Sequence, residues 1–177
     1  MNEYMEMENL NLKNQLLGVT ALSAEYCNTL EMCRELEPDD FILRMLNLLP
    51  RLYLAFTDVR TDDDLTMIDE GEYFESYVDE VFYDSIRRNV EAVLGPDDTF
   101  LETFEENMKY SDTPIAASIS ESLADIFQPL FNFISIVKDS EGEKIEAAYR
   151  ECREDFESYW AQTLCNVLRA INYLKYR

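Results

Sequence analysis

Turn-forming residues are scarce in this sequence, which has only four glycines and five prolines among 177 residues. Sandwiches and barrels built from short strands need such residues at intervals of roughly 8–12 positions. The chain cannot supply them at that frequency, whereas long helices with short connections need few. The sequence therefore predicts an all-α fold, and its length is that of one domain covering residues 1–177.

Apolar residues recur at steps of three and four positions along most of the chain, which is the spacing of one helical face. Leu12, Leu16, Val19 and Leu22 begin the first such series. We expect an antiparallel bundle of about six helices, with a long C-terminal helix. The expected ranges are 11–35, 38–56, 72–94, 98–110, 114–137 and 141–173.

Prolines give further detail about two of these helices. Pro50 and Pro129 lie inside apolar helical patterns, where a proline removes one hydrogen bond and is expected to kink or divide the helix. The helix that contains Pro50 is apolar on nearly every side, which predicts a place in the middle of the bundle. Thr113 and Pro114 predict the start of the next long helix, with Asp112 or Thr113 as its N-cap.

The charge of the chain restricts its partners. Lys and Arg number 15 and Asp and Glu number 37, so the net charge is −22. Such a charge repels nucleic acids and anionic membranes. A basic protein or a divalent cation remains as a possible partner, and the sequence predicts no oligomeric state.

The N-terminus has neither the basic nor the apolar region of a signal peptide. No apolar run approaches the roughly 20 residues of a membrane-spanning helix. We therefore expect a cytoplasmic protein, in which the four cysteines are reduced thiols.

Histidine is absent from the sequence, which excludes several kinds of catalytic site. Nucleophilic triads that use histidine as the base are excluded, as are zinc and di-iron sites with histidine ligands. An enzyme built on this chain would depend on carboxylates, Tyr, Lys, Cys or bound Mg²⁺. Among the tyrosines, Tyr73, Tyr77, Tyr149 and Tyr159 have the spacing of core-facing residues.

Two acidic pairs form the one candidate metal site. Glu102 and Glu105 are three residues apart, and Glu121 and Asp125 are four apart, so each pair would share a helix face. On facing helices these oxygens could hold Mg²⁺, which could bind a nucleotide and activate a water molecule.

This arrangement resembles the all-helical nucleotide pyrophosphohydrolases of the MazG and dimeric dUTPase type. Their motif is Glu-Glu-x-x-Glu followed by Glu-x-x-Asp at the start of an apolar helix. Glu102 and Glu105 would represent part of the first motif, and Asp125 the final Asp. The sequence departs from the pattern because Ser122 stands where a Glu is required and Glu121 is one residue out of register.

A wider resemblance involves several segments distributed along the chain. They are Ala24-Glu25-Tyr26-Cys27, Leu48-Leu49-Pro50-Arg51-Leu52-Tyr53, Met108-Lys109-Tyr110-Ser111-Asp112, residues 118–126 and Phe156-Glu157-Ser158-Tyr159-Trp160. In these segments the chain resembles an uncharacterised family of small acidic proteins from Bacteroides and related gut bacteria, known as a domain of unknown function. The resemblance implies a helical bacterial protein, and it implies no activity, cofactor or catalytic residue.

Two functional hypotheses follow. The first is a non-enzymatic acidic interaction or regulatory module that binds a basic protein, with a nucleic-acid mimic as its more specific version. It requires no catalytic residue and no cofactor. The alternative is a Mg²⁺-dependent nucleotide pyrophosphohydrolase, with Glu102, Glu105, Glu121 and Asp125 as metal ligands.

Overall fold

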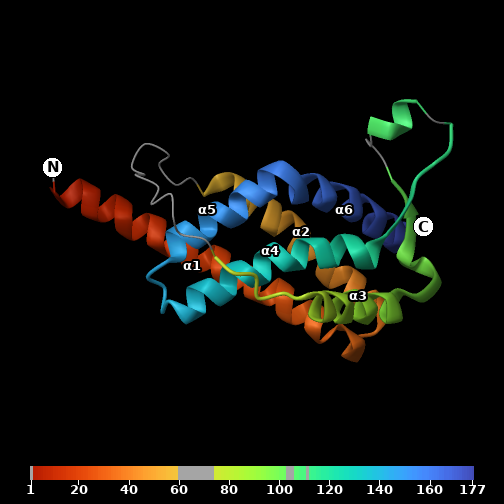
Figure 1. The fold of residues 1–177 in the computed structure, drawn as a ribbon, viewed down its shortest axis with the longest axis horizontal. Helices are drawn as coiled ribbons and strands as arrows, with labels where there is room; N and C mark the ends of the chain where they lie inside the picture. Colours follow the sequence, from red (N-terminus) through yellow and green to blue (C-terminus); the bar gives the residue numbers. More distant parts are fainter. Residues whose placement is uncertain (1, 60–73, 103–105, 111) are drawn as a thin grey trace.

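The computed structural model of the protein describes residues 2–59, 74–102, 106–110 and 112–177, and within these it is almost entirely helical (Figure 1). The α-helices are α1 (Asn2–Glu31), α2 (Pro38–Asp58), α3 (Glu80–Leu94), α4 (Ile119–Asp139), α5 (Ile145–Asp155) and α6 (Ala161–Tyr176). A π-helical segment, η5 (Phe156–Trp160), joins α5 to α6 without a break. The three form one long C-terminal helix, so the described residues contain five helices rather than the expected six.

The expected helix at residues 98–110 is the one that is missing. The described part of this region contains short turns, η3 (Gly95–Asp98) and η4 (Glu106–Lys109), and a strand, β1 (Thr99–Leu101). β1 pairs antiparallel with β2 (Ala116–Ser118), with Thr99 opposite Ser118. The prediction was wrong because the spacing of apolar residues reports only local structure, and this strand's partner lies 17 positions further along the chain.

The predicted starts of three helices also need correction, and α1 begins at Asn2 rather than at residue 11. α4 begins at Ile119 rather than at Pro114, and its N-cap is Ser118, whose hydroxyl accepts a hydrogen bond from the Glu121 amide. α3 begins at Glu80 rather than at residue 72, because the side chain of Asp79 caps it by accepting from the Phe82 amide. Before α4, strand β2 and the two residues that precede it replace the expected first turn.

The core is organised around α4, which packs against α1, α3, α5 and α6 (Figure 1). The apolar helix α2 does not hold the central place that was predicted for it. It packs mainly against α6 and α1, and Leu43 and Leu54 on its outer side are about half exposed. α2 and α4 both continue through their internal prolines, Pro50 and Pro129, so neither proline divides its helix.

An aromatic cluster joins α2 to the C-terminal helix. The ring of Phe56 lies 5.3 Å from that of Tyr149 and 4.9 Å from that of Trp160, measured between ring centroids. The Phe156 and Trp160 rings are 4.6 Å apart. Trp160 is completely buried, and its Nε1 donates a hydrogen bond to the Cys152 carbonyl at 3.3 Å. The π-helical segment is therefore fixed by buried side chains on its inner side.

Among the described helices none is long and apolar enough to cross a membrane. All four cysteines are free of disulfide bonds, as expected for reduced thiols.

Candidate functional site

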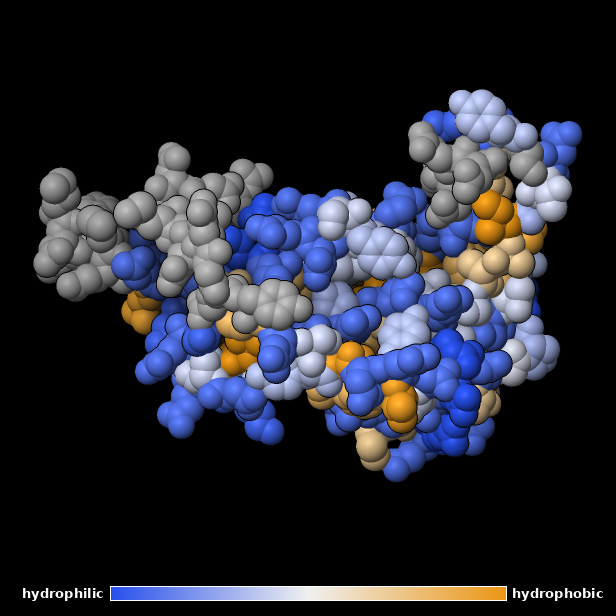
Figure 2. All heavy atoms as spheres, viewed as in Figure 1, coloured by the Kyte–Doolittle hydropathy of each residue, from blue (hydrophilic) through white to orange (hydrophobic). Residues whose placement is uncertain are grey.

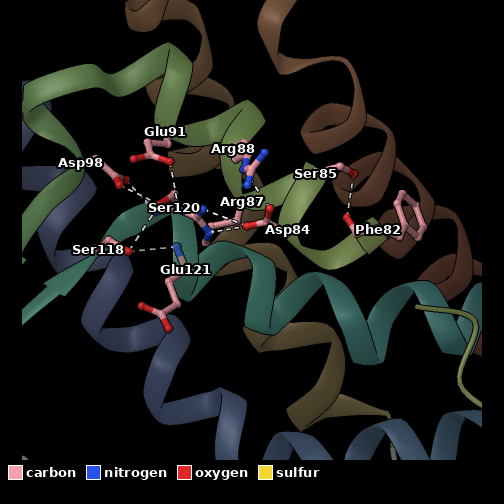
Figure 3. A network of polar contacts seen from close by, with 10 residues as sticks. All are labelled: Phe82, Asp84, Ser85, Arg87, Arg88, Glu91, Asp98, Ser118, Ser120 and Glu121. Atoms are coloured by element: carbon pink, nitrogen blue, oxygen red, sulfur yellow. Dashed lines mark hydrogen bonds and ion pairs between the residues drawn. The ribbon is translucent and has the colours of Figure 1, made fainter. Parts of the chain in front are cut away.

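The start of α4 is held by two separate oxygen acceptors (Figure 3). The Ser118 hydroxyl accepts from the Glu121 amide at 3.2 Å. The Asp98 carboxylate accepts from the Ser120 amide at 2.7 Å and from the Ser120 hydroxyl at 2.6 Å. Two of the amides that a helix leaves unpaired in its first turn are thus satisfied, and the orientation of α4 relative to β1 is fixed.

A recess of about 340 Å³ lies beside this helix start, between α4 and the C-terminal helix. Its lining is mainly polar. It comprises three carboxylates together with hydroxyl and amide groups, among them Glu102, Glu121, Asp125, Ser118, Tyr159 and Asn166. We call it the acidic recess, because no lysine or arginine of the described residues lines it.

The predicted metal ligands are partly brought together here. Glu121 and Asp125 are one helical turn apart on α4 and both face the recess, as their spacing predicted. Glu102 reaches the same recess from the end of β1 rather than from a facing helix. Glu105 lies outside the described residues.

Tyrosine hydroxyls occupy both oxygens of Asp125. Tyr83 from α3 donates to Oδ1 at 2.6 Å, and Tyr159 from the π-helical segment donates to Oδ2 at 2.7 Å. Burial and the hydrogen bond to Asp125 raise the pKa of Tyr159 to about 12, and the same two causes raise the pKa of Tyr83. Both phenols therefore stay protonated at neutral pH and remain donors.

Glu102 is held by an amide pair on α6. Asn166 donates from Nδ2 to Glu102 Oε1 at 2.5 Å, and Gln162 donates to Asn166 Oδ1 at 3.3 Å. Two carboxylates of the recess, Asp125 and Glu102, are thus oriented by neutral donors. The described residues bring no three Asp, Glu, Cys or His side chains into an arrangement that could hold a metal ion.

Sequence reasoning missed the residues that orient these carboxylates. Tyr159 has the spacing of a core-facing residue, yet it is 55% exposed and lines the recess. Tyr83 and Asn166 carry no local signal, since they lie 42 and 64 positions from the residues that they contact. Of the three serines around the start of α4, Ser118, Ser120 and Ser122, only Ser118 and Ser122 line the recess.

The two arginines of α3 are paired with carboxylates of the same helix. Arg87 and Arg88 both pair with Asp84, at 2.9 and 2.8 Å, and Arg87 also pairs with Glu91 at 2.9 Å (Figure 3). These pairs, which involve the half-buried Arg87 and Asp84, offset part of the acidity of α3. Most of the acidic residues between positions 62 and 84 lie outside the described residues. The face shown in Figure 2 is largely hydrophilic, with small scattered hydrophobic groups.

The carboxylates that precede the π-helical segment affect one another. Burial raises the pKa of the Glu151 carboxyl, and the charges of Asp155 and Glu154 raise it further. Burial and Glu154 likewise raise the pKa of Asp155. Because each pKa is higher in the folded state, the stability linked to these protons is present below the unfolded pKa of roughly 4 and is lost as the pH rises through the folded pKa.

Glu151→Gln is therefore expected to raise the free energy of unfolding at pH 7 by up to about 0.5 kcal/mol, a small value because exposed charges are screened by water. The gain measured by urea unfolding should be smaller at pH 4, near the unfolded pKa, than at pH 7. Glu157→Gln is the matched control and should give no gain, because Glu157 pairs with Arg153 at 3.0 Å. If Glu151→Gln gave the same gain in stability at the two pH values, the raised pKa of Glu151 would be contradicted.

Residues 11–177 match the model of a protein family described as a domain of unknown function, DUF5063. The chain belongs to this family. The match confirms the resemblance drawn from the sequence segments, and the family description carries no activity. No match was found among curated proteins.

The DUF5063 chain is also similar to a solved structure. The crystal structure of protein BF1032 from Bacteroides fragilis is 29% identical, covers 92% of this chain and 96% of that chain, and superposes with a TM-score of 0.77. The similarity confirms the all-α fold and the relation to a Bacteroides protein.

Proposed function

We propose that this DUF5063 protein is a non-enzymatic binding module whose acidic recess receives a basic side chain of a partner protein. The observation that carries the proposal is the meeting of Glu102, Glu121 and Asp125, from two separate segments, at one recess that no described lysine or arginine lines. Carboxylates that line one recess attract a cationic group more strongly than a single carboxylate does.

The hydrogen-bonding groups of the recess support a ligand that donates hydrogen bonds. A carboxylate has about four acceptor positions, and the phenols use one on each oxygen of Asp125. The remaining positions suit the N–H groups of a guanidinium or an ammonium, which form strong charge-assisted hydrogen bonds with carboxylates. The net charge of −22 would also speed the approach of a basic partner.

The proposal includes a cytoplasmic location. Free thiols are typical of a reducing compartment, and all four cysteines of the chain are free.

The proposal is tested with a fluorescent, acetylated and amidated tri-arginine peptide as probe. Exposed ion pairs contribute about 0.2–1 kcal/mol each, so the double variant Glu102→Gln/Glu121→Gln should bind the probe about tenfold more weakly in fluorescence polarisation. The affinity of the wild type should also fall as salt is raised from 50 to 200 mM, since salt screens exposed charges.

The matched control is Glu143→Gln/Glu146→Gln. It removes the same number of charges from exposed positions near the far end of α4 and should leave the affinity nearly unchanged. If both double variants lose affinity equally, binding depends on net charge alone and the recess is not the site. If the wild type does not bind the probe, the proposed function is wrong.

The Mg²⁺-dependent pyrophosphohydrolase remains the second candidate, because three of its four predicted ligands line one recess. Three observations weigh against it. The described residues bring no three Asp, Glu, Cys or His side chains into an arrangement that could hold a metal ion. Both oxygens of Asp125 already accept from phenols, and Ser122, at the motif's Glu position, donates its hydroxyl to the Ser118 carbonyl at 2.9 Å. A panel of nucleotides assayed with and without Mg²⁺ distinguishes the two candidates.

A further inference from the structure

Asp125 connects three elements of the bundle through its two oxygens. Its side chain extends from α4, Tyr83 reaches it from α3, and Tyr159 reaches it from the π-helical segment. The two donor–acceptor distances, 2.6 and 2.7 Å, are those of strong hydrogen bonds to a carboxylate. Only two of the three residues, Asp125 and Tyr159, line the acidic recess.

A carboxylate without such partners turns easily, because the terminal torsion of an aspartate is broad. A donor on each oxygen restricts this rotation and fixes the plane of the carboxylate. The directions left open for a ligand are then fixed as well. Preorganisation of this kind lowers the cost of ordering a site when its ligand binds.

Tyr83 is suited to hold this position. Its ring packs against the hydrophobic core, so the hydroxyl is presented from a restrained side chain. Burial and the neighbouring Asp125 raise its pKa, which keeps the hydroxyl a donor. Tyr159 makes the equivalent contact from the ligand side, where its ring is 55% exposed.

We propose that Tyr83 is a positioning residue, which orients the Asp125 carboxylate for a basic ligand without touching the ligand itself. This inference rests on the proposed function, and it assigns a role to a residue outside the acidic recess. It also explains why α3, which contributes no lining residue, is coupled to the recess.

The test is a double-mutant cycle on the full chain with the tri-arginine probe. Tyr83→Phe removes only the hydroxyl and should weaken binding about three- to tenfold. In an Asp125→Ala background the same change should have no further effect, because the carboxylate that Tyr83 orients is absent. Should Asp125→Ala fail to fold, as judged by circular dichroism, Asp125→Ser takes its place because it also lacks the carboxylate.

Tyr77→Phe is the matched control. It removes a tyrosine–aspartate hydrogen bond of similar length, 2.8 Å from Tyr77 to Asp139, at a place outside the recess, and it should leave probe binding unchanged.

Several outcomes would overturn the inference. Wild-type affinity in Tyr83→Phe would show that Asp125 needs no positioning, and the proposed function would stand if Glu102→Gln/Glu121→Gln still weakened binding. An equal loss in both backgrounds would show that Tyr83 acts on the fold in general. A wild type that does not bind the probe would overturn both the inference and the proposed function.

Discussion

Replacing Asp98 with alanine is expected to lower the free energy of unfolding by about 3 kcal/mol, because a hydrogen bond to a charged group contributes roughly 1.5–3 kcal/mol. Asp98 is only 8% exposed, and its two oxygens accept from the amide and the hydroxyl of Ser120. The alanine variant would leave the buried amide without an acceptor and the hydroxyl with only its longer contact to Ser118 Oγ at 3.4 Å. Urea unfolding followed by circular dichroism at pH 7 measures the loss.

The adjacent aspartate provides the control for this prediction. Asp97 makes an exposed ion pair with Arg177 at 2.7 Å, and such pairs contribute about 0–1 kcal/mol. Asp97→Ala should therefore change the stability by less than about 1 kcal/mol. Equal losses in the two alanine variants would mean that Asp98 does not hold the start of α4.

Trp160→Ala is expected to cost about 4 kcal/mol, within the range of about 3–5 kcal/mol for removing a buried large aromatic side chain. The indole fills the space between α2 and the C-terminal helix, where it contacts Phe56 and Phe156. Its loss would create a cavity that these rings cannot fill by small shifts. Because Trp160 is the single tryptophan, unfolding should be followed by circular dichroism rather than by fluorescence.

Two further variants test whether packing is the cause. Trp160→Phe keeps an aromatic ring and should lose less than half as much stability as Trp160→Ala. Tyr173→Ala removes a ring that is 67% exposed on the last helix and should change the stability by less than about 0.5 kcal/mol. A cost for Trp160→Ala as small as that of Tyr173→Ala would contradict the assignment of the aromatic cluster to the core.

The helices are the part of this structure that the sequence predicts well. α2 begins at Pro38, as the sequence predicts. The three- and four-residue spacing of apolar positions predicts α1, α2 and the long C-terminal helix. Helical hydrogen bonds join residues four apart, so the pattern that encodes them is local. The error at residues 98–110 has the same origin, because β1 owes its conformation to β2 and not to its own sequence neighbours.

One part of the candidate site is likewise predictable from local spacing, and the other part depends on residues that are distant in the chain. The spacing of Glu121 and Asp125 on one helix determined that both would face the same recess. Their orientation depends on Tyr83 and Tyr159, which lie 42 and 34 positions away along the chain. The start of α4 depends equally on Asp98, 22 positions before its partner Ser120.

The amino-acid sequence by itself thus determined the helical class, the net charge of −22 and the absence of histidine chemistry, because composition and local spacing suffice for these. Only the tertiary structure decided which carboxylates gather and what restrains them. Contacts between residues that are distant in the chain depend on how the helices pack, and Tyr83 and Asp98 meet their partners only in the folded bundle.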